Sequence, residues 1–325
     1  MHSPCLLGCV LLTACVFTTS YRLPPPARRA QVLEFIEPKS KTKVVLIGSM
    51  HYNPHSIRLT KDTVEEYASS LHSVMIESCP QRWNISENSN GVLRDYILYN
   101  EMRAAADAAS AFNVSLVLAD QDFNITSARL KATFKSSLVD LINPLVGWKA
   151  IYNDISTAFE ETFPKSRNDQ EYLSLNDFFN SKLLINAPIS LIRYPLALIL
   201  KAPRQSLTVL IGIVIMSIVA NNYNNSATNL NDVLEYYLSS PENMLAFIKQ
   251  ETVELLQSLL VAGVEIAILG RTMLVALLKE RNEVIANKIL EECEQAANTY
   301  SPKTVVAVLG MAHLNGIRFL LDKNH

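Results

Sequence analysis

Two apolar runs of the same form, VVLIGSMH and VVAVLGMAH, lie near the two ends of the chain. Each is rich in aliphatic residues and ends in Gly-x-x-His, at Val44–His51 and Val305–His313. Short apolar runs bounded by glycine are typical of buried strands, and the glycine lets the chain turn where the strand stops. Ligand-binding groups gather at the carboxyl ends of strands in α/β sheets. We therefore predict that His51 and His313 converge if both strands belong to one sheet.

The remaining pattern predicts further strands and helices around these two runs. Strands are expected at Gln31–Glu37, Lys43–Ile47, Ser73–Glu77, Val114–Ala119 and Thr304–Leu309, and helices at Thr60–Leu71, Gly91–Phe112, about 240–261 and about Met273–Gln295. The first two strands form a hairpin. Because strands and helices then alternate, the sequence predicts an α/β fold with a central, largely parallel or mixed sheet and flanking helices.

Three segments define the expected domain organisation. Residues 1–30 are a signal or targeting segment with a linker, and residues 31–320 form one α/β domain. A mostly helical insertion covers about 127–260 and contains an apolar block at 183–220.

The N-terminus indicates entry into the secretory pathway or an organelle. An apolar stretch of signal-peptide length, Cys5–Phe17, precedes the basic, proline-rich YRLPPPARRA. Four glycosylation sequons are compatible with a glycoprotein, at Asn84, Asn113, Asn124 and Asn224. These features argue against a cytoplasmic location.

The block at 183–220 predicts membrane association. It carries only three charges, Arg193, Lys201 and Arg204. A single crossing would place the two Gly-x-x-His motifs on opposite sides of the bilayer. The block is therefore expected to cross twice as a hairpin, to lie in the interface, or to act as a lid.

Composition excludes some functional classes. The net charge is −2 and the pI is about 6.3, so the chain has no basic excess for a nucleic-acid partner. Only Cys79 and Cys293 lie outside the N-terminal segment, which argues against a disulfide framework or a cysteine-rich zinc module.

The candidate chemistry centres on a metal set of His51, His313 and Glu77. Chance placement predicts only about 0.2 Gly-x-x-His matches in such a chain, and it has two. Imidazole and carboxylate suit zinc, manganese or cobalt. The alternatives are that each histidine caps a strand, that Glu77 pairs with Arg82 at the surface, and that Asp120 serves a turn.

Four segments in this order resemble the TraB/PrgY family, kin to the TIKI, GumN and ChaN proteins. They are LIGSMHYNPHS, VMIESCPQRW, KERNEVIANKI and VVAVLGMAHLNGI, within about residues 31–320. The resemblance implies an α/β fold and a site that includes the two Gly-x-x-His motifs. It also implies an acid, which matches Glu77, and an arginine, which matches Arg82. The family's late Glu-Arg-Asp signature matches Glu280-Arg281, here followed by Asn282. The family's Asp-Arg pair matches Asp120 followed by Gln121. In the family, metal-dependent peptidases and inactivation of peptide signals are described.

Two functional hypotheses follow. In the first, the protein is a metal-dependent hydrolase of the peptidase type, in which His51, His313 and Glu77 hold the ion. Glu280 or Glu77 is then the base, and Arg281 or Arg82 orients the acid or polarises a carbonyl. In the second, it is a non-catalytic, membrane-associated regulator that binds a peptide or lipid through 183–220. A third reading leaves the histidines purely structural.

Overall fold

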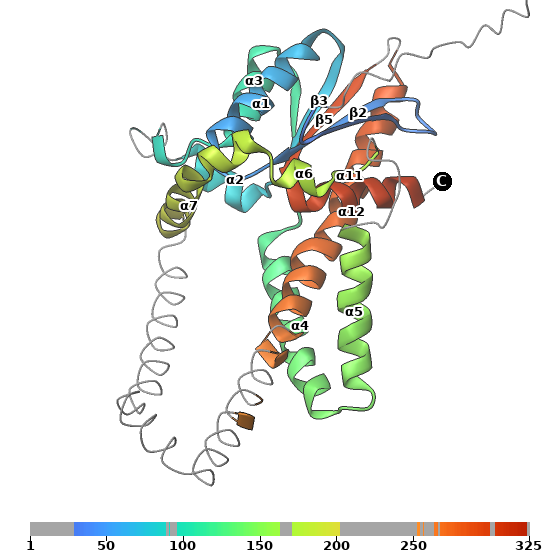
Figure 1. Cartoon of the computed structure of the whole chain (residues 1–325). Coiled ribbons are helices and arrows are strands. Elements are labelled where there is room, and N and C mark those ends of the chain that lie inside the picture. The colour runs from blue at the N-terminus through green and yellow to red at the C-terminus, as the bar shows by residue number, and fades with distance from the viewer. Residues whose placement is uncertain are drawn as a thin grey trace, which may run out of the picture.

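A five-stranded mixed sheet forms the centre of the computed structural model (Figure 1). The structure describes residues 29–88, 91, 96–162, 171–201, 252–253, 256, 263–265, 267–299 and 303–323. The strands are β1 (Val32–Ile36), β2 (Lys43–Ser49), β3 (Leu71–Ile76), β4 (Ser115–Leu118) and β5 (Thr304–Gly310), in the order β1-β2-β5-β3-β4. Only β1 is antiparallel to its neighbour. The predicted α/β class and the N-terminal hairpin are confirmed.

Alternate residues of the central strand pack on opposite faces of the sheet. Val305, Ala307 and Leu309 belong to a core with helices α11 (Glu280–Ala297) and α12 (Met311–Lys323). Val306 and Val308 belong to a core with α1 (Pro54–Glu66) and α3 (Glu101–Ala111). This two-residue period places two helices on each face, and the motifs stay at the strand ends.

Five further helices are described, of which α2 (Pro80–Glu87) contributes Trp83 and α7 (Ser181–Lys201) contributes Leu183 to the two cores. The other three are α4 (Phe123–Ile142), α5 (Gly147–Thr162) and α6 (Leu175–Phe178). Helices α4 and α5 form a hairpin that projects away from the sheet (Figure 1), and the π-helical segment η3 (Thr272–Lys279) packs against both. None of the helices within the described residues has the length and apolar character needed to cross a bilayer.

Several predicted boundaries are wrong. The helix predicted at Thr60–Leu71 is α1, which begins at Pro54 because Asn53 caps it, and Leu71 already belongs to β3. Helix α3 begins at Glu101 rather than near residue 91. The last predicted helix is divided at Glu280 into η3 and α11. The N-terminal segment, 202–220 and most of the helix predicted at 240–261 lie outside the described residues.

Candidate functional site

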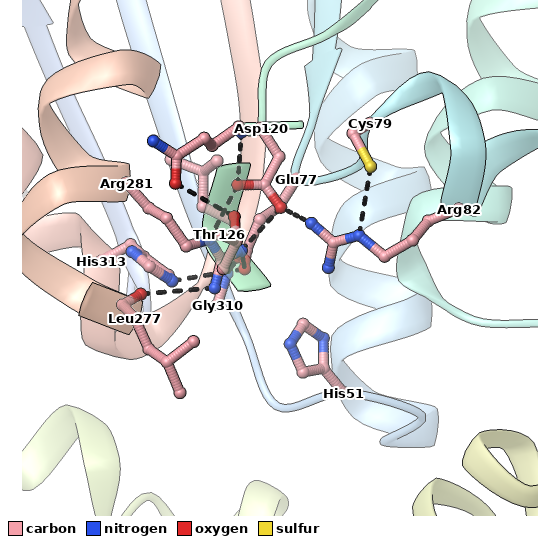
Figure 2. Close-up of polar contacts among 12 residues, drawn as sticks. His51, Glu77, Cys79, Arg82, Asp120, Thr126, Leu277, Arg281, Gly310 and His313 are labelled. Atoms are coloured by element: carbon pink, nitrogen blue, oxygen red, sulfur yellow. Dashed lines mark hydrogen bonds and ion pairs between the residues drawn. The ribbon is translucent and has the colours of Figure 1, made fainter. Parts of the chain in front are cut away.

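The candidate site lies at the carboxyl ends of four parallel neighbouring strands. His51 follows β2, Glu77 follows β3, and Asp120 follows β4. Gly310 ends β5, and His313 lies in the first turn of α12. The order β2-β5-β3-β4 therefore places these residues along a single edge (Figure 2).

The two Gly-x-x-His motifs meet at Gly310. A Cβ atom added there would lie 3.6 Å from His51 Nε2, 3.6 Å from His313 Cδ2 and 3.2 Å from Glu77 Oε2. Figure 2 shows the two imidazole rings on either side of this glycine. Gly310 thus leaves open the space that the two rings border, and a methyl group there would crowd Glu77 Oε2 most closely.

Glu77 is buried and surrounded by donors. Its Oε2 accepts a hydrogen bond of 2.6 Å from the Gly310 N–H, and its Oε1 accepts one from Arg281 Nη2. His313 Nε2 lies 3.3 Å from the same Oε1. Burial alone would raise the pKa of this carboxyl, but His313 and Arg281 outweigh burial and lower it well below 4.5. Glu77 is therefore an anion throughout the physiological pH range.

Arg281 joins Glu77 to Asp120. Its Nε donates to Asp120 Oδ1 and its Nη2 to Asp120 Oδ2, both at 2.7 Å, so the guanidinium grips that carboxylate with two parallel bonds. Arg82 also pairs with Asp120, and its Nε lies 3.5 Å from the sulfur of Cys79. The two arginines neutralise the acids and fix their positions.

Glu101 pairs with the Nδ1 atom of His51. Its Oε1 lies 2.6 Å from His51 Nδ1, and its Oε2 accepts the Tyr52 N–H at 3.1 Å. Burial lowers the pKa of His51, but the fully buried Glu101 carboxylate outweighs burial and raises it from 6.5 to about 9. The Nδ1 proton is thereby fixed toward Glu101, and Nε2 faces the Gly310 space.

Asn282 does the same for His313. The Asn282 Oδ1 accepts a hydrogen bond of 2.6 Å from His313 Nδ1, which leaves Nε2 toward Glu77. Metal-binding histidines are oriented in this way, with one ring nitrogen bonded to an oxygen and the other presented to the ion. The two histidines thus have equivalent support from Glu101 and Asn282.

The donor chemistry of the site fits a divalent ion, although its present arrangement is not a ready-made ligand sphere. In the described part of the chain, no three His, Cys, Asp or Glu side chains are placed to hold a metal. Arg281 and the Gly310 N–H occupy both Glu77 oxygens, so an ion would compete with these donors for the carboxylate. Two presented Nε2 atoms beside an ionised carboxylate remain the donor set that zinc, manganese or cobalt accepts.

The structure brings five of the six predicted site residues together: His51, Glu77, Arg82, Arg281 and His313. The sixth, Glu280, turns to Arg129 on α4, whose Nε lies 3.6 Å from its Oε2, and it is not among the described contacts of Glu77. The surface pair expected as an alternative for Glu77 and Arg82 is wrong, because Glu77 is buried against Arg281.

Sequence reasoning left three members out of the predicted set of site residues. Asp120 matches the family's Asp-Arg pair but could also serve a turn; its Oδ1 does accept the Gln121 N–H, and the carboxylate is buried between two arginines. Glu101 looks like an ordinary acid in the first turn of a helix. Asn282 stands out only as a departure from the family signature.

Comparison with known proteins adds no relative: the chain matches no protein-family model and no curated protein.

Proposed function

We propose that the protein is a metal-dependent hydrolase whose ion is held by His51, His313 and Glu77. The observation that carries the proposal is the pairing of each imidazole Nδ1 with a buried oxygen, at 2.6 Å in both cases. The Nε2 atom of His51 thereby faces the Gly310 space, and the Nε2 atom of His313 faces the ionised Glu77 carboxylate beside it. A histidine that only capped a strand would need no such support.

The residues of the chain have separate tasks in this proposal. Glu101 and Asn282 hold the two imidazole rings, and Arg281 orients Glu77. A bound divalent ion supplies Lewis acidity, which polarises a carbonyl and favours ionisation of water. Because its pKa is held so low, Glu77 suits the role of a ligand better than that of a general base. Glu280, paired with Arg129, is not proposed as the base.

A peptide is the proposed substrate. This choice rests on the resemblance to the TraB/PrgY family, in which peptidases and inactivators of peptide signals are described. The guanidiniums of Arg281 and Arg82 are engaged with carboxylates, so they support the site rather than bind an anionic group such as phosphate.

Metal binding tests the proposal directly. Titration calorimetry of the purified chain with Mn²⁺, Co²⁺ and Zn²⁺ should show one site, and His51→Ala and His313→Ala should each weaken it by about 100-fold or more. The control is His55→Ala, since His55 lies in the first turn of α1. Peptide cleavage should stop with a chelator and return with the ion. Absence of uptake, or uptake unchanged in His51→Ala, would contradict the proposal.

One observation favours the second candidate, a membrane-associated binding protein. Helix α7 exposes large apolar side chains such as Ile185 and Leu191, while its Tyr194 stacks on His51 with ring centroids 6.0 Å apart. A regulator that binds a peptide or lipid along α7 would bind its ligand equally well in His51→Ala and His313→Ala. The hydrolase would lose cleavage in both variants, so the same pair of proteins separates the two functions.

A further inference from the structure

The turn between α4 and α5 exposes an unusual group of apolar side chains. Four of them follow one another closely and are mostly open to solvent: Ile142 at 84%, Leu145 at 88%, Val146 at 68% and Trp148 at 55%. The turn is the convex apex of a hairpin that projects away from the sheet (Figure 1). We name residues 142–148 the apolar apex. Contiguous exposed apolar surface of this kind marks an interaction site.

Three N–H donors of the apolar apex form hydrogen bonds within the hairpin. The indole N–H of Trp148 donates to the Leu141 carbonyl at 3.0 Å, so the exposed ring presents carbon. The N–H groups of Asn143 and Gly147 donate to carbonyls one turn earlier. A Cβ atom on Gly147 would lie 2.0 Å from the Asp140 carbonyl oxygen, so the tight turn requires a glycine. These donors would therefore remain hydrogen-bonded if the apex entered an apolar medium.

The charges nearest the apolar apex are also compensated. Asp140 precedes it and Asp154 follows it, and both pair with the buried guanidinium of Arg271, at 2.5 and 2.7 Å. The one other charged residue between positions 140 and 154 is the cation Lys149. The hairpin end therefore presents apolar side chains and a positive charge, a combination that suits an anionic lipid surface.

We propose that the apolar apex inserts into the surface of a phospholipid bilayer. A convex apex offers no groove for a peptide, and four side chains fall far short of the roughly 20–30 residues a side that a stable protein interface uses. Insertion into lipid needs no such area, and tryptophan prefers the membrane–water boundary. The inference does not depend on the proposed hydrolase activity. Because α4 begins just after the end of β4, insertion would turn the candidate site toward the membrane.

The fluorescence of Trp148 tests this inference. The chain has two tryptophans, and the other, Trp83, is buried. The full chain is mixed with phosphatidylcholine–phosphatidylserine vesicles whose acyl chains carry bromine. We expect the emission to shift to the blue and to be quenched by the brominated lipid, and the response to vanish in Trp148→Phe. The readout is local to Trp148, so it does not depend on how other segments meet the membrane.

Two charge substitutions complete the test. Leu145→Glu should reduce the lipid quenching of Trp148 about tenfold, because a charge replaces a leucine that inserts into the lipid. Ile36→Glu is the matched control: this exposed apolar residue lies at the opposite edge of the sheet, and its substitution should change nothing. Quenching of Trp148 by aqueous iodide but not by brominated lipid would overturn the proposal. So would a Leu145→Glu variant that changes only the sedimentation coefficient, since the apex would then bind a second copy of the chain.

Discussion

Removal of the Arg281 guanidinium is the sharpest perturbation of the candidate site. Arg281→Met keeps most of the side-chain length and deletes the hydrogen bonds to Asp120, at 2.7 Å each, and the bond to Glu77. Both acids are buried. The variant therefore leaves two anions in the interior with fewer donors, and the cost appears in the free energy of unfolding.

The partners that remain to Asp120 and Glu77 in Arg281→Met determine how much stability is lost. Breaking a buried ion pair by removing one member costs roughly 3–5 kcal/mol. Asp120 keeps Arg82, and Glu77 keeps the Gly310 N–H at 2.6 Å. We therefore expect the low end, about 3 kcal/mol at pH 7. For a chain of this size, that corresponds to a melting temperature lower by roughly 4–5 °C.

Denaturant unfolding at several pH values measures this effect. In the wild type the pKa of Glu77 lies well below 4.5, so its stabilisation is complete above that pH and is lost as the pH falls through the lowered pKa. Without Arg281 this pKa rises, and the difference between the two proteins should shrink in acid. Arg129→Met is the control, because the Arg129 side chain is 62% exposed and its 3.6 Å pair with the half-buried Glu280 is worth less than about 1 kcal/mol. A cost for Arg281→Met below about 1 kcal/mol, or one independent of pH, would refute this reasoning.

Three further predictions concern neighbouring groups. Glu101→Gln should return the pKa of His51 from about 9 toward 6.5, as followed by NMR titration of the ring. The His51–Glu101 ion pair stabilises the fold fully below pH 6.5, and this stabilisation is lost as the pH rises through about 9. The pKa shift alone corresponds to roughly 3 kcal/mol of stability. Because 35% of the His51 side chain is exposed, solvent screening reduces this contribution to about 1–2 kcal/mol at pH 7. Gly310→Ala should leave the fold intact in circular dichroism but abolish metal uptake, because the added methyl group enters the space between the imidazoles and displaces Glu77. Gly147→Ala should destabilise the chain by about 2–3 kcal/mol in urea, since its Cβ overlaps a backbone carbonyl of α4.

The strands were the most predictable part of the fold, but their order was not. The strand expected at Lys43–Ile47 is β2 and the one expected at Thr304–Leu309 is β5, each within two residues of the prediction. Local apolarity defines such buried strands. It carries no information on neighbours, and β5 lies between β2 and β3. Glu77 consequently lies directly beside Gly310 and His313.

The helix boundaries depended on capping chemistry that periodicity does not record. Asn53 Oδ1 accepts the His55 N–H, and Pro54 occupies the first turn, so α1 begins six residues before the apolar face at Val64 and Tyr67 would suggest. The same helix then ends before Leu71, whose side chain enters the sheet core.

The site was only half predictable, for a related reason. His51 and His313 belong to a repeated motif, which can be detected in the sequence. Their partners Glu101 and Asn282 lie 50 and 31 residues away from them along the chain; Glu101 belongs to no motif, and Asn282 stands where the family signature has an aspartate. Such partners are defined by the packing of α3 and α11 against the strand ends, which a single sequence does not encode in any local pattern.

The charges of the site supply a last test that separates a metal centre from a purely structural network. Glu77, Asp120 and Glu101 are buried acids, and Arg281 and Arg82 balance two of them. His51, with a pKa of about 9, balances the third as a cation.

An ion that binds through Nε2 must therefore displace a proton from His51, because only the neutral imidazole is a ligand. Calorimetry at pH 7 in buffers of different ionisation enthalpy should show release of about one proton per ion. Metal affinity should increase up to about pH 9, and in Glu101→Gln the release should fall to a small fraction of a proton. Binding without proton release would place the ion elsewhere and leave the two histidines with a structural role.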